Sequence, residues 1–414
     1  MRTRVFAIAT LVFALSGFGF ASFSTYDFAQ HLDRQVHDIH CSFVPGLVAA
    51  SSETSGCQLT LMSRYSSVLR TQFWGGIPIS LPGMSVFAFL AFFATYLLFS
   101  GADRDKKVTS FTVAAWALPV LTSCVMAYFA LVELDAVCKL CIGIYTSSLF
   151  GFLSALGLHL SAGAEPSIDL GAADATQVSG PPAALAPKRS VLWAIPLAGL
   201  FVLLPASAYV AAMPEYAAFA GGCGELTQKE DRYNVLVPLT AAPNGVPAIE
   251  VLDPLCSACK AFEGRLESSG LDERLNRRAL LFPLDDECNW MVSSALHPGA
   301  CAVSEAILCA PSQANDILAW SFANQTQIMQ AERATDGAAA RMVTAQFPST
   351  QGCVGSTRIR SQLHRGLRWA VQNELPVLTP QLFVDGKKLC NEDTDLGLEY
   401  SLTQMLERRA GVAR

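Results

Sequence analysis

The sequence predicts two folds in one chain: a membrane α-helical bundle, and after it a soluble α/β domain. Of its 414 residues, 51% are hydrophobic and only 15% are charged. The mean hydropathy is +0.34, which is too apolar for an ordinary soluble protein. A formal net charge of -6 argues against nucleic acid as a partner. Each half also contains one CxxC dithiol, which points to thiol–disulfide chemistry.

The first half contains apolar runs of the length that a bilayer span needs, about 20 residues. The first run follows Arg2 and Arg4, as in a signal peptide, but it exceeds the usual apolar core of one, so we interpret it as a retained anchor. The fifth run follows a segment rich in Ala, Gly, Pro and Ser, which is typical of a flexible linker. The expected spans are Val5–Phe23, Ile79–Phe99, Val108–Leu131, Ala136–Leu160 and Val191–Met213.

Basic residues predict which side of the membrane each connection occupies, because Lys and Arg accumulate in cytoplasmic loops. Met1–Arg4, Gly101–Lys107 and the linker ending at Arg189 are the basic connections. Alternation then places Asp27–Gly76 and everything after Met213 outside the cytoplasm. The thirteen cysteines agree with an oxidising compartment on that side.

Two cysteine pairs in the membrane half are candidates for electron transfer. Cys138 and Cys141 lie one helical turn apart at the outer end of the fourth span, on one face of the helix. Lys139 between them favours a reactive thiolate, although small cysteines at a helix contact are an alternative. Cys41 and Cys57 lie in the first outer loop, where a static disulfide is the competing interpretation.

These residues resemble the vitamin K epoxide reductase family. The resemblance is carried by the two loop cysteines, the run CQLTLMSRYS, the segment WGGIPISL and the run CKLCIGIY. It implies a four-helix bundle around a quinone, either ubiquinone or menaquinone. By this resemblance Cys141 faces the quinone, Cys138 exchanges with Cys57, and Cys41 meets the outside partner. Tyr145 and Ser63 would contact the quinone.

The soluble half places its dithiol at the junction of a strand and a helix. A predicted strand, Ala248–Leu252, leads into Cys256 and Cys259, and a predicted helix covers Lys260–Ser268. A thiol at a helix N-terminus has a lowered pKa, which activates the first cysteine. Further along, Leu375–Leu389 predicts a strand, a proline and a second strand with an Asp-Gly turn.

This half resembles the thioredoxin superfamily, with Thr379-Pro380 in the place of its cis-proline. Helix-like stretches within Leu271–Gln372 make the DsbA type, which has a helical insertion, the closer likeness. The dipeptide Ser257-Ala258 differs from the Gly-Pro and Pro-His forms. Because that dipeptide tunes the redox potential, oxidase and isomerase both stay open.

The remaining cysteines of the soluble half are expected to form mostly structural disulfides, with Cys288–Cys301 and Cys309–Cys353 as the suggested pairs. No metal site is expected, because the two CxxC motifs lie in different halves and cannot converge on one zinc ion. Cys124 is expected to be a small buried residue. The histidines before Cys41 are expected at the surface, although His40 could tune that thiol.

The predicted organisation is a bundle over 1–160, a cytoplasmic linker over 161–190, a fifth membrane helix over 191–213 and a thioredoxin-like domain over 216–414. The expected function is a quinone-linked enzyme that forms disulfides in extracytoplasmic proteins with reduced cysteines. The resemblances imply a bacterial inner membrane protein with its soluble domain in the periplasm. The alternatives are an isomerase or reductase domain on the same membrane half, and a membrane-anchored thiol chaperone without catalysis.

Overall fold

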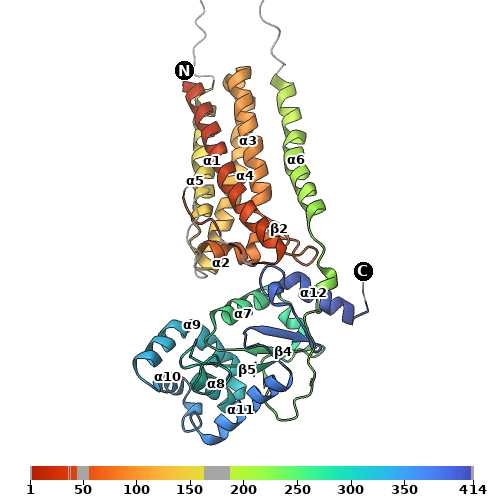
Figure 1. The fold of residues 1–414 in the computed structure, drawn as a ribbon. Coiled ribbons are helices and arrows are strands. Elements are labelled where there is room, and N and C mark those ends of the chain that lie inside the picture. Colours follow the sequence, from red (N-terminus) through yellow and green to blue (C-terminus); the bar gives the residue numbers. More distant parts are fainter. Residues whose placement is uncertain (1, 36, 38, 44–55, 163–186, 412–414) are drawn as a thin grey trace, which may run out of the picture. The chain divides into compact units, whose positions relative to one another are not determined.

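The computed structural model describes residues 2–35, 37, 39–43, 56–162 and 187–411. The predicted linker over 161–190 lies mostly outside these residues. The described chain forms two compact units, each of which is traced in Figure 1. Unit 1 contains Met1–Leu69 and Gly75–Pro214, and unit 2 contains Arg70–Trp74 and Glu215–Arg414.

Within the described part of unit 1, five helices are long and apolar enough to cross a membrane. They overlap the five predicted spans, and the largest difference is in the first helix, which continues to Gln30 beyond the predicted end at Phe23. Shorter elements between them are the 3-10 turn His31–Asp33, α2 (Gly56–Met62), the strands β1 (Ser67–Val68) and β2 (Ile77–Pro78), and a π-helical turn at Phe129–Glu133. The long helices are α1 (Arg2–Gln30), α3 (Ser80–Ser100), α4 (Lys106–Tyr128), α5 (Lys139–Ser161) and α6 (Pro187–Ala212).

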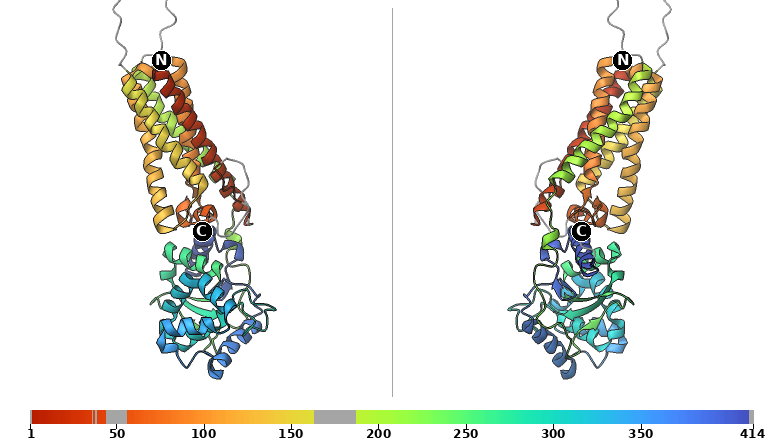
Figure 2. Two further views of the ribbon diagram at one scale, coloured as in Figure 1. Left: turned by 90° about the vertical axis from the view of Figure 1, so that its left-hand side faces the viewer. Right: turned by 90° about the vertical axis from the view of Figure 1, so that its right-hand side faces the viewer.

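The helices of unit 1 run side by side, as both views of Figure 2 show. Helix α1 packs on α3 and α5, and α5 also packs on α4. Gly151 of α5 allows a close approach to α4, since even a methyl group there would overlap the ring of Trp116. Cys124 corrects one expectation: it is exposed on the surface of α4 and not buried.

Unit 2 is built on a five-stranded sheet with the order β3-β5-β4-β6-β7. β4 and β5 are parallel and are joined by α7 (Ser257–Ser269), as a crossover requires. The other pairs are antiparallel, and α12 (Leu398–Arg409) follows the last strand. The strands are β3 (Val237–Pro238), β4 (Val246–Leu252), β5 (Leu275–Leu281), β6 (Gln381–Val384) and β7 (Lys387–Lys388).

The segment around Pro380 differs from its prediction. Residues before Pro380 form no strand in this described region; both strands follow it. Asp385 and Gly386 join them through the predicted turn, with φ values of 53° and 84°. The apolar run Leu375–Leu378 looked like a strand from composition alone, but it is partly exposed and pairs with no neighbour in the sheet.

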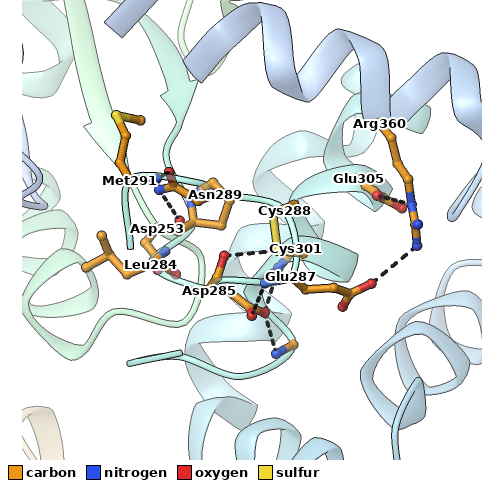
Figure 3. Close-up of a disulfide and its surroundings, with 12 residues drawn as sticks. Asp253, Leu284, Asp285, Glu287, Cys288, Asn289, Met291, Cys301, Glu305 and Arg360 are labelled. Carbon is orange, nitrogen blue, oxygen red and sulfur yellow. Dashed lines mark hydrogen bonds and ion pairs between the residues drawn. A yellow bond between two sulfur atoms is a disulfide. The ribbon is translucent and has the colours of Figure 1, made fainter. Parts of the chain in front are cut away.

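Four helices between β5 and β6 form the predicted insertion: α8 (Ala300–Cys309), α9 (Ala314–Ala334), α10 (Ala338–Gln346) and α11 (Thr357–Gln372). The two suggested disulfides, Cys288–Cys301 and Cys309–Cys353, are confirmed. Figure 3 shows the first beside Asp285, whose carboxylate accepts the backbone N–H groups of Gly299 and Cys301. Cys223 and Cys390 form a third bond.

A buried ion network connects the sheet to α7. Arg277 of β5 donates to Glu250 of β4 at 2.8 Å and to Glu263 of α7 at 2.6 Å and 3.2 Å. Burial, together with the nearby charge of Glu263, raises the pKa of Glu250 well above its usual value. The guanidinium therefore compensates two carboxylates beneath the helix that carries Cys259.

Candidate redox site

The soluble dithiol lies where β4 leads into α7. Cys256 is the N-cap of the helix, and its Sγ accepts the backbone N–H of Cys259 at 3.4 Å. Both side chains are buried, with exposed fractions of 5% and 0%, and both are free thiols. The fold thus places one sulfur at the helix terminus and the other inside the first turn, as the sequence predicts.

The two thiols have opposite acidities. A hydrogen bond from the Cys259 thiol, helped by a contact with Thr379, lowers the pKa of Cys256 to about 6. Burial raises the pKa of Cys259 well above its ordinary value. At neutral pH Cys256 is therefore the thiolate and attacking group, and Cys259 keeps its proton.

The peptide bond between Thr379 and Pro380 is cis, and the carbonyl of Thr379 lies 3.7 Å from Cys256 Sγ. The insertion also contacts this loop, because Gln325 of α9 donates to the carbonyl of Cys256 at 2.8 Å. Segments that lie 69 and 123 residues away in the sequence therefore fix the backbone around one sulfur.

A histidine that sequence reasoning missed lies beside this dithiol. His297 Nδ1 is 2.7 Å from Asp253 Oδ2, and that carboxylate also accepts the backbone N–H groups of Leu255 and Leu284. Although burial lowers the pKa of His297, the hydrogen bond and charge of Asp253 outweigh it and raise that pKa overall. Only tertiary folding brings His297 to Asp253, 44 residues earlier in the chain.

In unit 1 the other four predicted cysteines form two disulfides. Cys41 pairs with Cys57 of α2 (Cα–Cα 5.8 Å), and Cys138 pairs with Cys141 (Cα–Cα 5.2 Å). Cys138 is the N-cap of α5, so it sits before the helix instead of on its face as expected.

These two pairs meet at one cavity of about 370 Å³ within unit 1. Cys57, Cys138 and Cys141 all line it, and so does Tyr145. Most other lining residues are apolar, among them Phe28, Ile39, Leu61, Val86, Phe87, Leu118, Met126 and Ile144.

The polar groups of the cavity differ from the expectation at one position. Ser63 does not line it: its hydroxyl donates to the carbonyl of Thr60 instead, at 2.8 Å. Ser66, Ser123, Ser148 and Asp27 are among the polar residues that do line it. His40, expected at the surface, is half-buried and bonded to Asp27. Asp27 lies 13 residues before His40 and beyond the predicted first span, Val5–Phe23, so sequence pattern alone gave it no role.

Comparison with known proteins agrees with the membrane half. Residues 8–156 match the model of the vitamin K epoxide reductase family. No curated protein matches the chain. Among solved structures, the chain is similar to the oxidoreductase DsbA from Xylella fastidiosa, with 16% identity over 43% of this chain and 95% of that one. The TM-score is 0.27, so the fold of unit 2 rests on its own strand order and dithiol.

Proposed function

With a vitamin K epoxide reductase family match over residues 8–156, we propose that this membrane oxidoreductase forms disulfides in other proteins and passes the electrons to a quinone. Cys256 and Cys259 take electrons from substrate thiols. Cys41 and Cys57 then carry them to Cys138 and Cys141.

One observation carries this proposal: an apolar cavity lined by cysteines from both membrane-half pairs. A quinone ring with an isoprenoid tail is apolar except at its carbonyl oxygens, so an apolar cavity with few polar groups fits it. Tyr145, Ser123 and Ser148 are hydroxyl groups on its wall. Cys141, the second sulfur of its pair, is our candidate for the one that faces the quinone.

In each exchange a thiolate attacks a disulfide and forms a mixed disulfide, which a second thiol then resolves. The thiolate of Cys256 breaks the Cys41–Cys57 bond and binds Cys41. Cys259 then displaces Cys41, which leaves two thiols in the loop and a disulfide in the soluble domain. Cys57 attacks Cys138 in the same manner, so two electrons move at each exchange. Fusion in one chain raises the effective concentration of one pair for the next.

The acidity of Cys256 supports an oxidase over an isomerase. A pKa of about 6 stabilises the reduced form as a thiolate at neutral pH, and a stabilised reduced form makes the disulfide a stronger oxidant. The substrates are then extracytoplasmic proteins with reduced cysteines. The basic residues Arg2, Arg4 and Lys107 support an inner membrane topology with unit 2 in the periplasm.

The test uses the purified full chain in detergent, a reduced unfolded protein and a soluble quinone analogue. The wild type should reduce the quinone while disulfides appear in the substrate protein. Cys141→Ser should abolish quinone reduction, and Cys124→Ser, which changes an exposed cysteine of α4, should not. If Cys141→Ser reduced the quinone no less than Cys124→Ser, the result would instead favour a thiol chaperone that the membrane half only anchors.

A further inference from the structure

Asp27 is a buried carboxylate at the wall of the membrane cavity. It lies in the last turn of α1, its exposed fraction is 0%, and it lines the same cavity as Cys57 and Cys141. An ionisable side chain that is fully buried at the end of a membrane helix is costly to desolvate, so its presence indicates a role. The disulfide exchanges proposed above give it none.

His40 is the partner of this carboxylate. Its Nδ1 lies 2.5 Å from one oxygen of Asp27, and its backbone N–H donates to the other at 2.9 Å. The other neighbouring imidazole, His31, is buried and bonds the backbone carbonyl of Asp27 at 2.7 Å, not the carboxylate.

The pair extends from the cavity towards solvent. Asp27 is fully enclosed, whereas the side chain of His40 is 17% exposed. Since Nδ1 of His40 is held by Asp27, Nε2 is the nitrogen left for water. His40 also directly precedes Cys41, whose disulfide partner Cys57 lines the cavity.

We propose that Asp27 and His40 form the path by which protons enter the cavity, an inference that rests on the quinone chemistry proposed above. His40 would take a proton from water at Nε2 and pass its Nδ1 proton to Asp27. Asp27 would then protonate a quinone oxygen.

The stoichiometry requires such a path. Exchange by thiolates leaves Cys138 and Cys141 as two thiolates, whose oxidation forms one S–S bond and releases two electrons but no proton, whereas reduction of a quinone to a quinol consumes two electrons and two protons. Thiol–disulfide exchange transfers the electron pair of a thiolate without its proton. Protons that leave substrate thiols therefore stay in the water outside and must reach the cavity separately.

The experiment measures quinone reduction by the full chain in detergent, with dithiothreitol as the electron donor and a soluble quinone analogue. Asp27→Asn should lower kcat by about 100-fold, the range of general acid catalysis, and leave KM for the quinone within about twofold. His40→Gln should act in the same direction, and Asp27→Glu should restore most of kcat. Added formate, a small proton carrier, should raise kcat of Asp27→Asn.

Asp33 and His37 provide a matched control pair. They are bonded at 2.8 Å, lie near the same end of α1, have exposed fractions of 47% and 31%, and do not line the cavity. Asp33→Asn should leave kcat unchanged.

Three results would overturn the proton path. They are a normal kcat for Asp27→Asn, a loss without any rescue by formate, and a loss of the Cys41–Cys57 disulfide in that variant, which would assign Asp27 to folding of the loop. A wild-type chain that reduces no quinone would instead contradict the proposed function itself.

Discussion

At the scale of single residues, the dithiol of unit 2 depends on the difference between two sulfurs one helical turn apart. Cys256 caps the helix and receives hydrogen bonds, whereas Cys259 lies inside the first turn and receives little solvation. Ionisation of Cys256 stabilises the reduced protein relative to an ordinary thiol with a pKa of about 8.5. That stabilisation is fully present above the ordinary pKa and is lost as the pH falls through about 6.

Alkylation of the reduced protein should report this asymmetry. The rate of iodoacetamide modification at Cys256 should rise with pH and reach half of its plateau near pH 6, because only the thiolate reacts. Cys259→Ala removes the side-chain hydrogen bond on the Cys256 sulfur, so its profile should shift to higher pH. Peptide mapping by mass spectrometry identifies the modified residue. A midpoint at the ordinary thiol pKa in both proteins would show that the Cys259 thiol does not tune Cys256.

At the scale of elements, β4, β5 and α7 hold the dithiol through one buried cation. Arg277 is 4% exposed and forms ion pairs with Glu250 and Glu263. Without Arg277, neither of these carboxylates would have a comparable cationic partner. A buried ion pair adds little net stability, but breaking it strands a charge.

Arg277→Leu should therefore lower the free energy of unfolding by about 3–5 kcal/mol. Pulse proteolysis of the full chain in urea and detergent measures this loss. The neighbouring Arg278→Leu is the control: its side chain is 39% exposed and lies 4.0 Å from Asp231, so it should cost under about 1 kcal/mol. Equal losses in the two variants would contradict a special role for the buried network.

Local patterns in the sequence were sufficient for the elements that local forces determine. Five apolar runs predicted five helices, and the CxxC motif of the soluble half marked a strand-to-helix junction. The predictions that failed concern contacts between elements that are distant in the sequence. Nothing in the run Leu375–Leu378 shows that it lacks a strand partner, and helical position alone does not tell whether Cys124 faces a neighbour or the surroundings.

The candidate site divides in the same manner. Its cysteines are visible as motifs, but His297 and Asp253 meet across 44 residues, and the sequence around Asp27, just beyond the predicted first span, gives no hint of a cavity. Ser63 was expected at the quinone, yet its hydroxyl is bonded to the backbone within its own turn.

At the scale of the whole molecule, the proposed relay requires both units' cysteines on one side of the membrane. A reporter fused after Arg414 should be active outside the cytoplasm, and one inserted near Gly171 should be active inside, because the basic segments predict this alternation. Paired alkaline phosphatase and green fluorescent protein fusions, which are active on opposite sides, measure it. The same side for both positions would mean that α6 does not cross the membrane.

The Cys223–Cys390 bond also determines how this molecule transmits force. The membrane helix α6 ends at Ala212, and Cys223 follows shortly after it in the sequence. A pull on that tether reaches Cys223 and passes through sulfur to Cys390, which lies near the other end of the unit. The segment between them, a sequence separation of 167 and an extended length on the order of 550 Å, is thus bypassed by a pull between the tether and the C-terminus while the bond is intact. For a pull between this tether and the C-terminus, the catalytic helix and the insertion lie within the bypassed segment, and reduction of one structural disulfide would expose them to that pull.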